Sequence, residues 1–258
     1  MYQFTHKLNT SFPHKGGQIY YERLGDPSDP AIIFLHGGFV DMEVFNPLLA
    51  LLGENYQFIG IDSRAHGRST LGDVSLNYQQ LQEDVEALLT HLGINHCNLI
   101  GFSDGGIVGY RLAALSHAIH IDRLVTIGSR WHIRNTDANK EQWLATTEQM
   151  RKTAQPQVYN RYQALNPEPD FAKLLTELTQ MWLDESNHGH PNDAITQIKC
   201  PVLACHGDDD PIVSFDVLYQ LTQRLSQAHL LNVPFAKHAA FVEQPLVFAQ
   251  IINQFLAK

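Results

Sequence analysis

The chain has 258 residues, which is enough for one large α/β domain with a continuous core. With 44% hydrophobic and 17% charged residues, its composition is that of an ordinary soluble globular protein. The net charge of -9 is spread along the sequence, and the few Lys and Arg residues form no basic stripe, which argues against a nucleic-acid partner. The acidic balance favours solubility, and it would also attract a cationic substrate.

Three cysteines without CxxC spacing lie in or beside apolar runs, at Cys97, Cys200 and Cys205. We expect them to be buried reduced thiols, which suits a reducing compartment. The first residues, Met1–Lys7, lack the basic start and apolar run of a signal peptide, and no later stretch approaches the roughly 18 apolar residues of a membrane span. The sequence therefore predicts a cytoplasmic protein without a membrane partner.

Seven short apolar runs rich in β-branched and aromatic residues are typical of strands. They are Ile19–Leu24, Ala31–Leu35, Gln57–Ile61, Cys97–Ile100, Leu124–Ile127, Val202–Cys205 and His229–Val233. Helix-like segments lie between several of them, such as those carrying Leu81 to Leu92 and Ile107 to Leu115. This alternation predicts an α/β fold with a mostly parallel central sheet and helices on both faces. Active sites of such sheets lie at the carboxyl ends of the strands.

The segment from Trp131 to Gln197 breaks this alternation, because it contains helix-like stretches at Lys140–Thr153 and Phe171–Leu183 but no convincing strand. It is too long for a loop and has sheet on both sides, so it predicts a helical lid over the carboxyl edge. The predicted organisation is a core of residues 1–130 and 198–258 with a lid at 131–197. A core-packing helix is expected at Phe241–Leu256.

The sequence Gly101-Phe102-Ser103-Asp104-Gly105 fits the G-x-S-x-G pattern and lies between a predicted strand and a predicted helix. A strand-to-helix turn this sharp strains its central residue, and flanking glycines remove Cβ atoms that would collide. The serine oxygen then projects from the top of the sheet. Ser103 is therefore the candidate nucleophile; a glycine-rich turn with a capping serine is the structural alternative.

A serine hydroxyl needs a general base, and the base needs an orienting carboxylate. In this fold the order along the chain is Ser, Asp, His. The segment His206–Val213 follows a predicted strand and contains three adjacent aspartates, of which Asp210 is the first candidate and Asp208 the second, while others cap the following turn. Although the chain has 14 histidines, His238 alone follows the aspartates at the carboxyl end of a strand, so it is the candidate base.

Attack on an acyl carbon places negative charge on the carbonyl oxygen, which requires N–H donors. The glycine turn Leu35-His36-Gly37-Gly38-Phe39 follows the second predicted strand. The N–H groups of Gly38 and Asp104 are the expected donors, with that of Phe39 as an alternative to Gly38. We expect Phe39 and Asp104 also to contact the substrate, and His36 to be structural.

These motifs, together with Asp62–Ser69, resemble in order those of the α/β-hydrolase superfamily, in the group of small lidded serine hydrolases. The second motif departs from the family pattern D-x-R-G-x-G-x-S, because Ala65 replaces its first glycine in a structural turn. Arg64 and Asp62 are expected to brace loops there. The resemblance implies an acyl-enzyme mechanism on a small-molecule acyl substrate, with no metal or organic cofactor. Ala239 replaces the Trp that relatives cleaving carbon–carbon bonds typically carry after the histidine, which disfavours that chemistry.

The elbow Gly-Phe-Ser-Asp-Gly-Gly also resembles that of hydrolases acting on α-amino-acid esters. The resemblance implies that Asp104 binds a substrate ammonium; the alternative is that Asp104 accepts hydrogen bonds from a neighbouring loop or Arg. The prediction is a serine esterase for a small carboxylic ester, including an aminoacyl ester. Two competing hypotheses are an acyltransferase or perhydrolase with the same triad, and a non-catalytic ligand-binding protein on this fold.

Overall fold

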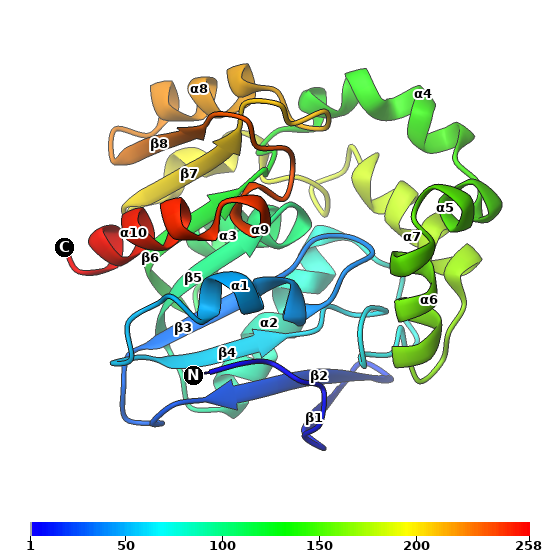
Figure 1. Ribbon diagram of the computed structural model, residues 1–258, viewed down its shortest axis with the longest axis horizontal. Coiled ribbons are helices and arrows are strands. Elements are labelled where there is room, and N and C mark those ends of the chain that lie inside the picture. Colours follow the sequence, from blue (N-terminus) through cyan, green and yellow to red (C-terminus); the bar gives the residue numbers. More distant parts are fainter. Residues whose placement is uncertain (1) are drawn as a thin grey trace.

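An eight-stranded sheet forms the centre of the computed structural model, which describes residues 2–258 (Figure 1). Its strand order is β1-β2-β4-β3-β5-β6-β7-β8. The β1–β2 and β2–β4 pairs are antiparallel, and the other five pairs of neighbouring strands are parallel. The strands are β1 (Ser11–His14), β2 (Gly17–Leu24), β3 (Ala31–Leu35), β4 (Gln57–Ile61), β5 (His96–Phe102), β6 (His120–Ile127), β7 (Val202–Gly207) and β8 (Ala228–Val233). The predicted mostly parallel sheet is confirmed.

Three strands of the sheet are buried along their whole length, as their apolar sequences require. Every residue of β3, β4 and β7 is buried, because helices cover both faces of the sheet. Strand β1 was not predicted. Its four residues alternate between exposed and half-buried, and Pro13 lies among them, which is tolerated because β1 forms an edge of the sheet.

Helices α2, α3 and α8 cover one face of the sheet, and α1, α9 and α10 cover the other (Figure 1). Their bounds are α1 (Asn46–Leu49), α2 (Tyr78–His91), α3 (Asp104–Leu115), α8 (Phe215–Arg224), α9 (Ala240–Glu243) and α10 (Pro245–Leu256). The sequence predicted one helix over Phe241–Leu256, but the structure divides it before Pro245. Proline disfavours helical backbone at the residue before it and suits the first position of a new helix.

A helical insertion between β6 and β7 lies beyond the carboxyl ends of the parallel strands (Figure 1). It contains η2 (Ile133–Thr136), α4 (Asp137–Ala145), α5 (Glu148–Ala154), α6 (Pro156–Leu165), α7 (Phe171–Trp182) and η3 (Asn192–Gln197). The predicted helix Lys140–Thr153 is two helices, because the Thr147 hydroxyl accepts a hydrogen bond from the Met150 N–H and starts α5. None of the helices in residues 2–258 is long and apolar enough to cross a membrane.

Arg64 of the Asp62–Ser69 motif joins separate loops through its hydrogen bonds. Arg64 is fully buried and donates two hydrogen bonds to Asp84, at 2.8 and 2.7 Å, and others to the carbonyls of His14 and Leu71. Ala65, in the position of the family glycine, has φ of +64°, which is the left-handed region that favours glycine.

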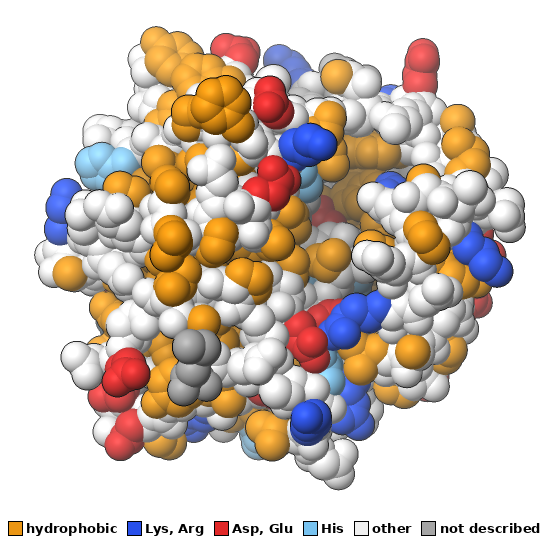
Figure 2. Space-filling model, viewed as in Figure 1, with side chains coloured by type: hydrophobic (Ala, Val, Ile, Leu, Met, Phe, Trp, Pro, Cys, Tyr) orange, Lys and Arg blue, Asp and Glu red, His pale blue; other side chains and the backbone are white. Residues whose placement is uncertain are grey.

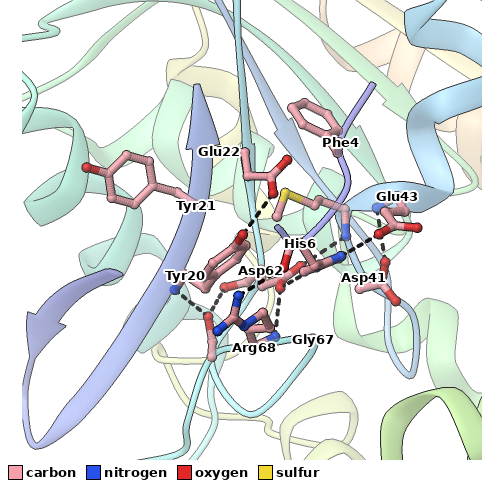
Figure 3. Close-up of polar contacts among 12 residues, drawn as sticks. Phe4, His6, Tyr20, Tyr21, Glu22, Asp41, Glu43, Asp62, Gly67 and Arg68 are labelled. Atoms are coloured by element: carbon pink, nitrogen blue, oxygen red, sulfur yellow. Dashed lines mark hydrogen bonds and ion pairs between the residues drawn. The ribbon is translucent and has the colours of Figure 1, made fainter. Parts of the chain in front are cut away.

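The buried carboxylate of Asp62 lies at the centre of a second polar cluster near the N-terminus (Figure 3). It accepts hydrogen bonds from the N–H groups of Met42 and Arg68 and from the His6 imidazole, the last at 2.8 Å. The other His6 nitrogen lies 2.7 Å from Glu43. Burial alone would lower the pKa of His6, but these two carboxylates outweigh it and raise the pKa to about 9.

The raised pKa of His6 predicts that the fold loses stability at high pH. His6 binds its proton more tightly in the folded chain, so its contribution is complete below the ordinary imidazole pKa of 6.5 and is lost as pH rises through about 9. We expect the difference in unfolding free energy between wild type and His6→Gln to shrink by about 2 kcal/mol from about pH 6 to about pH 10. Urea denaturation at each pH measures it. The exposed His188→Gln variant is the control, and a difference that does not change with pH would contradict the assignment.

Candidate active site

Ser103 occupies a strained turn between β5 and α3. Its backbone angles are φ +51° and ψ −115°, and its N–H donates to the carbonyl of Ile127 on β6 at 2.8 Å. Glycine is required beside it: a Cβ on Gly105 would lie 2.0 Å from the carbonyl oxygen of Leu35. The turn therefore packs directly against β3 and β6, and it presents the Ser103 side chain at the carboxyl edge of the sheet.

Backbone strain at Ser103 predicts that glycine at this position stabilises the fold. The angles mirror those of ordinary extended backbone, so they suit glycine but cost a side-chain-bearing residue about 1–3 kcal/mol. We expect the free energy of unfolding of Ser103→Gly to exceed that of Ser103→Ala by about 1 kcal/mol. This figure is the relieved strain minus the larger backbone entropy that glycine loses on folding. Chemical denaturation of the two variants measures this difference. Equal stabilities would show that the turn is not strained.

His238 lies in the loop between β8 and α9 and joins Ser103 to Asp210. The Ser103 hydroxyl is 3.1 Å from its Nε2, and its Nδ1 donates to Asp210 Oδ2 at 2.8 Å. The imidazole contacts the ring of Phe102, with centroids 5.0 Å apart. A Cβ on Gly128 would lie only 3.0 Å from the imidazole, so glycine after β6 leaves it room. The three side chains form one hydrogen-bonded chain.

Asp210, and not Asp208, faces His238. The second oxygen of Asp210 accepts from the N–H groups of Ile212 and Val213, at 2.8 and 3.1 Å. Burial alone would raise the pKa of this carboxyl, but the hydrogen bond and charge of His238 and the two N–H donors outweigh it and lower the pKa. Asp208 is exposed and instead accepts a hydrogen bond from the Phe235 N–H at 2.7 Å.

The glycine turn after β3 lies against the Ser103 turn. A Cβ on Gly37 would be 2.8 Å from the Ser103 Cβ, and one on Gly38 would be 2.9 Å from the Asp104 carboxylate. Asp104 is the first residue of α3, and the N–H of a first helical residue has no acceptor within its own helix. His36 is buried and accepts a hydrogen bond from the Ser63 N–H at 2.9 Å, which ties the turn to the loop after β4.

The Asp104 carboxylate is buried and already holds two side-chain donors. The Tyr78 hydroxyl donates to its Oδ1 at 2.8 Å, and Trp182 Nε1 lies 2.9 and 3.1 Å from its two oxygens. Burial raises the pKa of Asp104, and these hydrogen bonds and the charges of Arg130 and His238 oppose the rise. The sequence suggested a loop or an Arg as the alternative partner of Asp104; the donors found are Tyr78 of α2 and Trp182 of α7.

Phe39 packs into the helical insertion. Its ring stacks on Phe171 at 5.4 Å and meets Trp182 edge-on at 5.7 Å, and the Arg151 guanidinium lies 4.5 Å from its centroid. Phe39 also lines a cavity of about 310 Å³ between the core and the insertion. In the lining of this cavity, Arg161 of α6 pairs with Asp41 and, at 3.0 Å, with Glu43. The surface is hollowed between the core and the helical insertion (Figure 2).

Arg130, the third residue after β6, was not identified from the sequence. It is buried, and its Nη2 donates to Asn139 of α4 and, at 2.6 Å, to the carbonyl of Ile212 beside Asp210. Its guanidinium lies 4.8 Å from the Trp143 ring centroid. Arg130 therefore joins the helical insertion to the loop that carries Asp210. Its position at the carboxyl end of a strand was the signal available in the sequence.

The cysteines and the clusters of potential metal ligands are separate from the chain of Ser103, His238 and Asp210. The three cysteines are free, with Cys97 and Cys205 buried and Cys200 half-buried. Within residues 2–258, the two clusters of potential metal ligands, one around His6 and one around His96, contain none of Ser103, His238 and Asp210.

Known proteins resemble this chain over most of its length. The sequence profile of the alpha/beta hydrolase family matches residues 32–251. The chain is 26% identical over 249 residues to the AB hydrolase superfamily protein YisY of Bacillus subtilis, covering 87% of this chain and 90% of that protein. It is 26% identical over 270 residues to the pimeloyl-(acyl-carrier protein) methyl ester esterase of Aeromonas hydrophila, covering 92% and 99%.

A solved structure shares the fold. The meta-cleavage product hydrolase from Pseudomonas fluorescens has a TM-score of 0.81 at 19% identity, with 98% of this chain and 99% of that chain covered. The shared architecture is the mostly parallel sheet with its helical insertion. Because the family profile spans most of the chain and the fold agrees, the protein belongs to the alpha/beta hydrolase family.

Proposed function

We propose that this hydrolase cleaves a small carboxylic ester through an acyl-enzyme on Ser103. The observation that carries the proposal is the hydrogen-bonded chain from Ser103 through His238 to Asp210. This chain supports the proposal, because acyl transfer needs a nucleophile, a base and an orienting carboxylate in such an arrangement. The Aeromonas relative, a methyl ester esterase by name, supports an ester substrate.

In the proposed mechanism each group has its own step. His238 Nε2 takes the Ser103 proton as Oγ attacks the acyl carbon, and Asp210 holds the imidazole with its Nδ1–H toward the carboxylate. The N–H groups of Gly38 and Asp104 stabilise the oxyanion. His238 then protonates the leaving alcohol. In the second half it removes a proton from the water that attacks the acyl carbon, and it returns this proton to Ser103 Oγ as the acyl–Oγ bond breaks and the acid leaves.

A panel of p-nitrophenyl esters of increasing acyl length tests this proposal. We expect turnover of short acyl chains, with the acid as product. The same reaction run with added alcohol or peroxide separates hydrolysis from acyl transfer, because a transferase or perhydrolase would form a new ester or a peracid at the expense of the free acid. Absence of both turnover and fluorophosphonate labelling would favour the non-catalytic alternative.

We further propose that the helical insertion, residues 131–197, is a lid and that the substrate is an aminoacyl ester. Trp182 of the insertion donates a hydrogen bond to Asp104, next to Ser103, which supports a lid over the acyl site. Asp104 Oδ1 accepts hydrogen bonds from both Tyr78 and Trp182. Oδ2 accepts a longer hydrogen bond from Trp182, at 3.1 Å, and lies toward Gly38. A carboxylate oxygen can accept more than one hydrogen bond, so Oδ2 has capacity for a substrate ammonium.

The ammonium proposal predicts a selective effect of Asp104→Ala. We expect KM for an aminoacyl ester to rise on the order of tenfold or more relative to that for a neutral ester of the same size, because the variant loses a buried charge-assisted hydrogen bond. Steady-state kinetics on the matched pair measures this. Trp182→Phe is the control, since it removes a donor to Asp104 but leaves the carboxylate. Equal effects of Asp104→Ala on both esters would rule out ammonium binding.

A further inference from the structure

We propose that His96, His120 and Asp122 form a binding site for a divalent transition metal such as Zn²⁺. The three residues lie at the amino ends of β5 and β6. One imidazole nitrogen of each histidine and one carboxylate oxygen of Asp122 all lie within 4.8 Å of one another. No step of the proposed ester hydrolysis uses them.

Strand pairing places these side chains on rigid backbone. His96 and His120 are direct partners in the parallel register of β5 and β6, which sets their side chains next to each other. The register shifts after the pair Cys97 and Ile121, because the next residue of β5 pairs with Arg123. Asp122 is therefore the extra residue of a bulge on β6. A bulge redirects a side chain. Asp122 and Arg123 are therefore both partly exposed, although Ile121 and Leu124 on either side are buried.

Distances between the ligand atoms suit a small cation. Asp122 Oδ1 lies 3.2 Å from His96 Nδ1 and 3.7 Å from His120 Nε2. Bonds of 2.0–2.1 Å in tetrahedral geometry place neighbouring ligand atoms about 3.3 Å apart. Both contacts are thus near the spacing of a metal centre. The first is also a hydrogen bond at the upper end of the usual range, and the second is too long for a hydrogen bond.

The other cluster of potential ligands, His6 with Asp41 and Asp62, is not free to bind a metal ion. Both nitrogens of His6 already lie against carboxylates, and its pKa is raised to about 9, so the imidazole holds a proton where a metal would bind. Asp41 pairs with Arg161. Within residues 2–258, by contrast, no Lys or Arg forms an ion pair with Asp122.

The donor set selects the metal. Two imidazoles and one carboxylate suit Zn²⁺, Ni²⁺ or Cu²⁺, whereas Mg²⁺ and Ca²⁺ prefer oxygen ligands throughout. The side chains are 62%, 62% and 40% exposed for His96, His120 and Asp122, so water can fill the remaining positions. Along β5 the site is about 23 Å from Ser103, at the opposite edge of the sheet. A bound ion would clamp the ends of β5 and β6.

Isothermal titration of tag-free protein with Zn²⁺ tests the site. We expect one saturable site in the wild type and in Ser103→Ala, with affinity at least tenfold weaker in His96→Ala, His120→Ala and Asp122→Asn. His229→Ala is the matched control: this exposed histidine lies in β8, near the same edge of the sheet, and should leave the affinity unchanged. Zn²⁺ should also raise Tm of the wild type but not of His120→Ala, because only the wild-type folded state binds the ion.

Two results would overturn the proposal. One is a wild type without saturable Zn²⁺ binding. The other is equal affinity in the wild type and the three ligand variants, which would place the ion among the remaining histidines. Either can occur with esterase activity intact.

Discussion

Ser103→Ala is expected to reduce kcat for p-nitrophenyl acetate by a factor on the order of 10⁴–10⁶ and to leave KM nearly unchanged. The variant loses the proposed nucleophile, whose Oγ lies 3.1 Å from His238 Nε2, while the proposed oxyanion donors remain. What activity is left would come from those donors acting on attack by water. Stopped or discontinuous assays at high enzyme concentration measure the residual rate.

Serine-directed chemistry gives an independent measurement for the same variant. A fluorophosphonate probe should label the wild type and fail to label Ser103→Ala. The exposed Ser226→Ala variant is the control and should be labelled and active like the wild type. Wild-type turnover by Ser103→Ala, after the variant has been purified from a host that lacks ester hydrolysis, would exclude Ser103 as the nucleophile.

Asp210→Asn is expected to lower kcat on the order of 10³–10⁴-fold, the second largest effect. The amide cannot stabilise the imidazolium that forms when Ser103 is deprotonated, and its NH₂ group can turn toward His238 Nδ1 and favour the wrong tautomer. The backbone donors to the other oxygen of residue 210 hold the side chain in place, so the fold should survive. Steady-state kinetics with a short-chain ester measures the effect.

Asp208→Asn is the matched comparison, since it is the same change two residues away. Asp208 accepts a hydrogen bond from the Phe235 N–H, which an amide oxygen can also accept, so kcat should change less than about fivefold. If Asp208→Asn lost activity and Asp210→Asn did not, the roles of the two carboxylates would be exchanged. Losses of equal size would mean that the loop acts as a unit.

Much of the fold could be predicted from the sequence because its signals are local. Uniformly apolar segments such as Ala31–Leu35 must be covered on both faces, so they identify the central strands. The pentapeptide around Ser103 identifies the sharp turn, since its conformation, with φ of +51°, tolerates few sequences. Helix ends were less predictable. The breaks before Thr147 and Pro245 depend on one capping hydroxyl and one missing N–H inside longer helix-like stretches.

The sequence by itself determined which residue types could carry the chemistry and in what order, because the G-x-S-x-G turn, the aspartate-rich loop and His238 each follow a strand. It ranked Asp210 before Asp208 but left the choice open, since turn geometry alone directs Asp210 toward His238 and Asp208 toward Phe235. Nor did it show that Tyr78 and Trp182 meet at Asp104, or that Arg130 bridges to Ile212. These contacts join residues far apart in the chain, and only the packing of the helical insertion on the sheet brings them within hydrogen-bonding distance.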